Sequence, residues 1–217
     1  MKKLYIVLFL TLTVIAANAQ SFAGKKMLTT TLSMADLTFA KAESANGTSP
    51  AQTFKSSYIG LAPEFTYGKV NAHNLLVAYG VSLSYSRGAN STGAAKTVNT
   101  AYGAGPTLLL QKFIPITSRI FYSPLGNVSA FYRKEKTNMS DAKQESYSAN
   151  MHLRPLSVTF QATSKTNILL LAGSVGLFYS NTKTTSPQIA GESVSRNSSV
   201  AVNVSANYFG IGFQRVI

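Results

Sequence analysis

The stretch from Asn74 to Gly88, NLLVAYGVSLSYSRG, constrains the fold most, because large apolar residues recur at every second position. A period of two is the side-chain period of a β-strand. One face carries Leu75, Val77, Tyr79, Val81, Leu83 and Tyr85, and the other, after Leu76, carries small or polar side chains. The run from Leu75 to Tyr85 matches the length of about 9–11 residues with which a tilted strand crosses a bilayer. The stretch therefore predicts a transmembrane strand with its apolar face toward lipid and its small face toward a narrow lumen.

The N-terminus has the three parts of a secretory signal peptide. Lys2 and Lys3 precede an apolar run over residues 4–17, and Ala17-Asn18-Ala19 follows before Gln20. The run is shorter than the about 20 residues of a spanning helix. We expect cleavage between Ala19 and Gln20, so that residues 1–19 are the signal peptide and residues 20–217 the mature protein. No later apolar run is long enough for a transmembrane helix, so a membrane-embedded chain would cross as strands.

The composition excludes several kinds of site and favours one kind of partner. The chain has no Cys, which excludes disulfides, thiolate metal sites and a Cys nucleophile. Its 20 Lys and Arg outnumber its 7 Asp and Glu, for a net charge of +13. Such an excess favours anionic partners. For an exported chain we expect membrane lipids, including the phosphates of lipopolysaccharide, and no nucleic acid, since export separates the protein from it.

Seven further segments show strand alternation. Alternation is clear over residues 55–68, 97–113, 168–180 and 199–217, with a change of phase near Tyr208, and it has mixed phase over residues 119–133 and 147–163. Residues 26–39 change phase near Asp36, as at a β-bulge. Polar stretches predict long loops at residues 41–53, 88–96, 134–146 and 181–197. The connections then alternate long and short, as in an up-and-down barrel with both termini on the periplasmic side.

Aromatic residues gather near both ends of the predicted strands. Tyr67, Phe113 and Phe121 are among those close to the short turns, and Tyr85 and Tyr102 are among those close to the other ends. Interfacial aromatic residues form such girdles in membrane barrels. The pattern predicts two girdles on the outside of the barrel.

Together these features resemble a known family. The resemblance is carried by the signal peptide, the eight alternating strands, and two sequence stretches: Gly103-Ala104-Gly105-Pro106 leading into Phe113-Ile114-Pro115-Ile116, and the terminal Phe209-Gly210-Ile211-Gly212-Phe213. They are similar to the small outer-membrane β-barrel proteins of the OmpA/OmpX type, in the style of Gram-negative, Bacteroidota-like bacteria. The resemblance implies an all-β chain, folded as an eight-stranded antiparallel up-and-down transmembrane β-barrel, monomeric, in the outer membrane of the cell envelope.

Few residues carry catalytic or metal chemistry. His73 and His152 are the two histidines of the chain, which gives weak support to a histidine metal site or a Ser-His-Asp triad. Barrels that resemble the outer-membrane lipid A deacylase have a Ser two residues after the His, and here Arg154 follows His152 at that spacing. We therefore expect no catalytic residues, no cofactor, no metal and no enzyme activity.

Three charged residues within predicted strands form the candidate site. A basic side chain that faces lipid at mid-membrane costs about 2–4 kcal/mol, so Glu64, Arg133 and Arg154 are expected to point inward. We expect Glu64 to form a lumenal ion pair with Arg133 or Arg154. In the alternative, both arginines lie at the membrane interfaces and reach lipid phosphates.

The interior of an eight-stranded barrel is just wide enough for side chains, so we expect a largely plugged lumen despite the porin-like fold. The predicted function is then structural, or a loop-mediated binding or interaction role with a ligand or protein that the sequence does not identify. One alternative is a narrow channel or small-solute transporter of the outer membrane. Another is a soluble secreted lipocalin-like ligand carrier, in which the large residues would face inward.

Overall fold

The computed structural model describes residues 22–44, 52–92, 95–138, 140–188 and 191–217, and this part of the chain consists of antiparallel strands joined by turns. The strands are β1 (Lys26–Ser44), β2 (Gln52–Val70), β3 (Leu75–Thr92), β4 (Ala95–Lys112), β5 (Ile114–Pro115), β6 (Ile120–Tyr122), β7 (Leu125–Thr137), β8 (Ser140–Arg154), β9 (Leu156–Gln161), β10 (Thr166–Gln188) and β11 (Gly191–Val216). The predicted signal peptide and its cleavage between Ala19 and Gln20 lie outside the described residues. Within the described ranges, no helix has the length and apolarity to cross a membrane.

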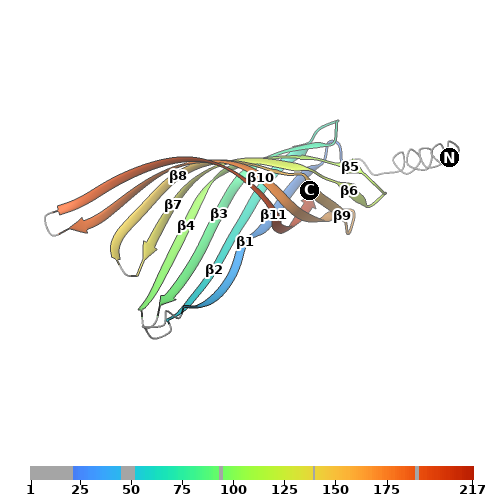
Figure 1. Cartoon of the computed structure of the whole chain (residues 1–217). Coiled ribbons are helices and arrows are strands. Elements are labelled where there is room, and N and C mark those ends of the chain that lie inside the picture. The colour runs from blue at the N-terminus through green and yellow to red at the C-terminus, as the bar shows by residue number, and fades with distance from the viewer. Residues whose placement is uncertain (1–21, 45–51, 93–94, 139, 189–190) are drawn as a thin grey trace.

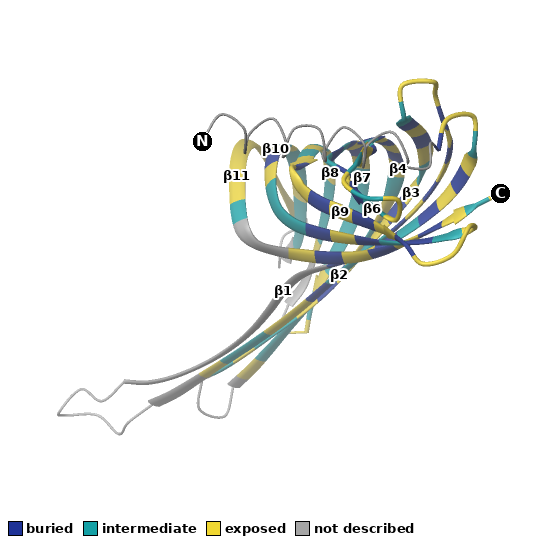
Figure 2. Cartoon of the chain, turned by 90° about the vertical axis from the view of Figure 1, so that its right-hand side faces the viewer, coloured by how far each residue is buried: buried dark blue, intermediate teal, exposed yellow. Residues whose placement is uncertain are grey.

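The sheet closes on itself. The hydrogen-bonded order runs β11-β1-β2-β3-β4-β7-β8-β10, and β10 pairs with β11 (Figures 1 and 2). β1 and β11 pair from Met27 with Val216 to Met34 with Phe209. Beyond that pair the β1–β2 and β10–β11 hairpins diverge (Figure 1). The ring has eight strand positions and confirms the predicted all-β, eight-stranded antiparallel up-and-down barrel.

Two prolines explain the mixed phase of two predicted strands. The strand predicted at residues 119–133 is β6 and β7 with Pro124 between them, and the one predicted at residues 147–163 is β8 and β9 with Pro155 between them. Proline donates no hydrogen bond to a ladder, and at Pro124 and Pro155 a paired segment ends. On one side of the prolines β7 pairs with β8, and on the other β6 pairs with β9. Two of the eight strand positions are thus each shared by two segments.

Both predicted changes of phase coincide with irregular pairing. In β1 the register shifts between Met34 and Leu37, which confirms a bulge near Asp36. In β11 the change near Tyr208 corresponds to a register shift against β10, where Ala172 pairs with Phe209 but Ser174 pairs with Ser205. Gly173, at the centre of that shift, has a positive φ of 65°, which glycine adopts without steric cost.

The prediction of long loops at residues 88–96, 134–146 and 181–197 is wrong, and that at residues 41–53 is wrong at residues 41–44 and 52–53, while residues 45–51 lie outside the described residues. Strand pairing continues to Ser44 with Gln52, Thr92 with Ala95, Thr137 with Ser140 and Gln188 with Gly191. These stretches are polar on both faces, so they lack the alternation that identifies a half-apolar strand. Ladder hydrogen bonds use the backbone alone, however, and polar side chains on both faces do not prevent them. Most of the described residues in these stretches therefore belong to paired strands that extend the barrel.

The distribution of apolar and polar side chains between the outer and inner faces is the reverse of that in a soluble barrel. Large apolar side chains on the outer face are exposed, among them Val77 at 43%, Leu108 at 43% and Val128 at 50%. Inner positions are buried and often polar, among them Glu64 at 6% and Gln111 at 0%. Figure 2 shows the resulting alternation of buried and exposed positions along the strands. The exterior is an apolar surface much larger than soluble monomers expose.

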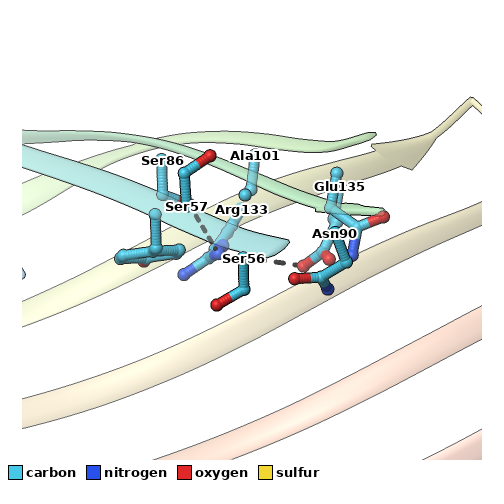
Figure 3. A pocket seen from close by; sticks show the side chains of 10 residues that line it. Ser56, Ser57, Ser86, Asn90, Ala101, Arg133 and Glu135 are labelled. Carbon is cyan, nitrogen blue, oxygen red and sulfur yellow. Dashed lines mark hydrogen bonds and ion pairs between the residues drawn. The ribbon is translucent and has the colours of Figure 1, made fainter. Parts of the chain in front are cut away.

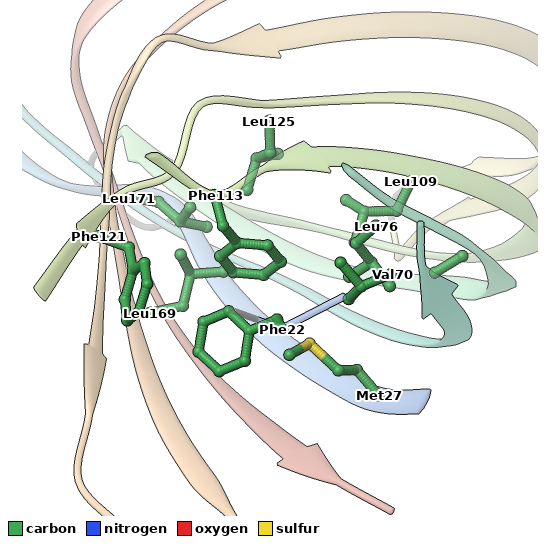
Figure 4. Close-up of a cluster of buried hydrophobic side chains, with 11 residues drawn as sticks. Phe22, Met27, Val70, Leu76, Leu109, Phe113, Phe121, Leu125, Leu169 and Leu171 are labelled. Atoms are coloured by element: carbon green, nitrogen blue, oxygen red, sulfur yellow. The ribbon is translucent and has the colours of Figure 1, made fainter. Parts of the chain in front are cut away.

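An apolar cluster lies inside the ring at the end where β1 begins and β11 ends (Figure 4). Phe22 is fully buried there, with its ring centroid 4.9 Å from that of Phe113 and 4.7 Å from that of Phe121. The cluster also contains Met27, Val70, Leu76, Ala78, Leu109, Leu125, Leu169 and Leu171. Phe113 and Phe121 were predicted in an outer girdle, which is wrong. Phe113 continues the inward parity of Leu109 and Gln111, and this parity outweighs its position at a strand end.

Gly105 gives a testable prediction about closure of the ring. A Cβ atom at Gly105 would overlap the carbonyl oxygen of Ala130 in β7, and the β4–β7 ladder is interrupted between Ala104 and Thr107. Gly105→Val should therefore lower the free energy of unfolding by at least about 1–3 kcal/mol, as measured by urea unfolding in detergent micelles. Ala104→Val, on the exposed outer face of the same strand, is the matched control and should behave as wild type. Equal stabilities of the two variants would contradict the prediction.

Candidate binding site at the mouth of the barrel

A polar hollow of about 540 Å³ lies on the inner face of β2, β3, β4 and β7, toward their hairpin ends (Figure 3). We call it the mouth pocket. It is lined by Ser56, Ser57, Tyr58, Ser86, Gly88, Asn90, Asn99, Ala101, Arg133 and Glu135. Gly88, Asn90 and Glu135 belong to strand extensions that the sequence analysis assigned to loops, and the other lining residues lie in predicted strands.

Small residues at matching register positions create the space. Ser86 of β3 pairs with Ala101 of β4, which pairs with Glu135 of β7. In the adjacent row Tyr58 pairs with Gly88. Because Gly88 and Ala101 have almost no side chain, the inner face is hollow between the aromatic ring on β2 and the carboxylate on β7.

Arg133 enters the mouth pocket from β7 and is held by two neighbours. Its Nη2 donates a hydrogen bond to Ser86 Oγ at 3.0 Å and lies 3.7 Å from Glu135 Oε2 (Figure 3). The side chains of Arg133 and Glu135 are 41% and 30% exposed, so both remain accessible from the mouth. These two residues are the charged ones that line the pocket, and their charges cancel.

The structure places the three predicted site charges at two depths. Glu64 and Arg154 are each 6% exposed and lie inside the ring, whereas Arg133 lies at the mouth. Asn127 Nδ2 donates a hydrogen bond to Glu64 Oε2 at 3.0 Å, and Arg154 is close enough to interact electrostatically with Glu64. The carboxylate that neighbours Arg133 is Glu135. An ion pair between Glu64 and Arg154 stays a prediction.

A hydrogen-bonded layer crosses the interior below these charges. Gln214 Nε2 of β11 donates to Gln111 Oε1 of β4 at 2.6 Å and to Thr29 Oγ1 at 3.2 Å. Gln111 Nε2 in turn donates to Thr159 Oγ1 at 3.3 Å. β4 and β11 are four steps apart in the ring of eight, so the two glutamines reach across it. The contact between the two glutamines depends on ring closure and could not be found from the sequence.

The histidines do not form a metal centre with other residues. Among the described residues there is no group of three His, Cys, Asp or Glu side chains that could hold a metal ion. His152 packs edge-on against Phe178, with ring centroids 4.8 Å apart.

The arrangement around the mouth pocket is suited to binding polar groups by hydrogen bonds.

Comparisons with known proteins add little to this geometry. No protein-family model and no curated protein matches the chain. Among solved structures, the β domain of the Bordetella autotransporter BrkA matches 90% of this chain and 100% of its own length, with 7% sequence identity and a TM-score of 0.26. A TM-score this low carries no weight, so the barrel is established by the strand pairing of this chain. The resemblance to the OmpA/OmpX type stays a prediction.

Glu64 and Arg154 give a prediction about stability. Because both side chains are buried, removal of one leaves the other charge unpaired, which costs about 3–5 kcal/mol. Glu64→Gln and Arg154→Met should each lower the free energy of unfolding in micelles, and the double variant should lose less than the sum of the two. Glu64→Gln with Arg133→Met is the control and should be additive within about 0.3–0.5 kcal/mol. Additivity for Glu64 and Arg154 as well would contradict the predicted pair.

Proposed function

We propose that the mature chain is an outer-membrane β-barrel protein without catalytic activity, whose role is structural or consists of binding at the mouth. The observation that carries the proposal is the apolar, exposed exterior around a polar, buried interior. Membrane barrels have this distribution, and a closed sheet satisfies its backbone groups without water. A soluble lipocalin-like carrier needs its large residues inside, so the distribution favours the membrane. The similarity to OmpA/OmpX-type barrels of Bacteroidota-like bacteria is part of this proposal.

The proposed orientation puts the end that holds both strand termini in the periplasm and the mouth pocket outside the cell. Met27 pairs with Val216, so the beginning of β1 and the end of β11 lie together at the end opposite the mouth (Figure 1). Outer-membrane barrels project farther on the extracellular side, and here the paired strands extend farthest at the mouth. Both termini are then periplasmic.

The interior favours a closed lumen over a narrow channel or small-solute transporter. The Gln111–Gln214 hydrogen bond reaches across the ring, and the cluster around Phe22 lies on the periplasmic side of it. The first places two hydrogen-bonded side chains across the ring, and the second is an apolar layer, which disfavours the passage of ions.

Basic residues support lipid partners. Arg87 is exposed on the outer face of β3, two positions beyond Tyr85 and so just above the apolar band. A guanidinium at this height reaches the phosphates of lipopolysaccharide while its stem stays on the apolar surface. Lys69, Arg119 and Lys165 are exposed at the end opposite the mouth, near the phosphates of the inner leaflet.

Cysteine accessibility tests the topology, because the chain has no native Cys. In intact cells a membrane-impermeant maleimide should label Asn90→Cys and Asn138→Cys, since both positions are exposed at the mouth. Val77→Cys, on the apolar exterior, and Ser82→Cys, 5% exposed in the interior, should stay unlabelled. Labelling of all four only after lysis, with the protein in the soluble fraction, would favour the lipocalin-like carrier instead.

Conductance tests the closed lumen. The wild-type protein in planar bilayers should carry no steady ion current, because side chains fill the interior at the two levels described. Phe22→Ala combined with Gln214→Ala removes bulk from both levels and should produce a measurable current. Phe209→Ala, at a position 59% exposed on the exterior, is the matched control and should not. A steady current through the wild-type protein would establish the channel alternative.

A further inference from the structure

The mouth pocket presents groups that donate and accept hydrogen bonds at the same time. The Ser56 and Ser86 hydroxyls and the Asn90 and Asn99 carboxamides line it from three neighbouring strands. A hydroxyl or a carboxamide offers both a donor and an acceptor, whereas a phosphate needs donors and an ammonium group needs acceptors. This mixture fits a ligand that consists mainly of hydroxyl groups.

The charged pair in the pocket also fits a neutral ligand. Arg133 and Glu135 lie 3.7 Å apart, so each already has an opposite charge beside it. A charged ligand that approaches one of them would be repelled by the like charge of the other. Two adjacent hydroxyl groups can donate to the carboxylate and accept from the guanidinium while the pair stays together, and hydrogen bonds to charged groups are the stronger ones.

An aromatic ring completes the lining. Tyr58 lies beside Gly88, where an added Cβ would be 3.5 Å from Tyr58 Cδ2, and the residue is 36% exposed. A tyrosine ring offers an apolar face next to polar groups, which suits the C–H face of a pyranose ring. The volume of about 540 Å³ falls within the range of about 300–1,000 Å³ for small-molecule sites.

We infer that the mouth pocket binds a neutral saccharide unit of an external glycan. The inference rests on the proposed function, since the pocket meets such a ligand only if the mouth opens outside the cell. Arg133 and Glu135 hold adjacent hydroxyls, and Tyr58 covers one face of the sugar. Asn99 Oδ1 accepts from Thr137 Oγ1 and Ser86 Oγ accepts from Arg133, so Asn99 Nδ2 and the Ser86 hydroxyl donate to further hydroxyls of the sugar.

Saturation-transfer NMR on the full mature protein tests the inference. The protein is kept in dodecylphosphocholine, because detergents with sugar headgroups would compete for the pocket. The probes are lactose, maltose and chitobiose, and at least one of them should receive saturation. Glucose, glucuronate and glucosamine serve as a charge series, in which neither charged sugar should bind more tightly than glucose.

Two variants on β4 locate the binding. Ala101→Phe fills the pocket without removing a hydrogen-bonding group and should abolish transfer, whereas Ala104→Phe places the same ring on the outer face and should leave it unchanged. Asn99→Ala should weaken affinity about tenfold, the equivalent of one lost hydrogen bond, and it serves as the test if Ala101→Phe does not fold.

The inference is overturned if none of the three disaccharides binds, if Ala101→Phe binds as wild type does, or if a charged sugar binds more tightly than glucose. These results are independent of membrane topology. Asn90→Cys labelled from outside together with no sugar binding refutes the saccharide site alone. Sugar binding by purified protein together with an inaccessible Asn90→Cys refutes the outer-membrane orientation alone.

Discussion

The pairing of β1 with β11, from Met27–Val216 to Met34–Phe209, is the contact on which the rest of the structure depends. An open sheet would leave two edges with unpaired N–H and C=O groups, which an apolar solvent does not tolerate. Once the first and last strands of the ring are joined, alternate side chains are confined to a narrow interior. Side-chain parity then decides whether a residue must be small or polar or may be large and apolar.

Confinement explains two features of the interior that are far apart in the sequence. At Gly105, β4 and β7 come so close that no Cβ fits between them. Farther along β4, Gln111 accepts a hydrogen bond from Gln214 of β11, the strand on the opposite side of the ring. Long polar side chains satisfy each other across a ring of eight strands because its diameter is about two side-chain lengths. The same narrowness lets Phe22 contact both Phe113 and Phe121 from the chain segment that precedes β1.

The face of the strand on which each side chain lies could be predicted from the sequence, because it depends only on alternation along the strand. The eight strand positions, the inward direction of Glu64 and the bulge near Asp36 all follow from a period of two. The strand extensions could not be predicted, because a strand that is polar on both faces has no period. The mouth pocket depends on register as well: nothing local to Ser86, Ala101 or Glu135 indicates that they form one row.

The extensions alter what kind of recognition the mouth can perform. A pocket on long flexible loops loses part of its binding free energy to ordering those loops. Here Ser86 and Asn99 stand on strands paired on both sides, and Arg133 is fixed by Ser86 and Glu135 before any ligand arrives. Side chains held in this way keep their geometry in the free protein. The barrel wall, continued past the apolar band, is therefore better suited to selecting a small rigid ligand than to adapting to a large variable one.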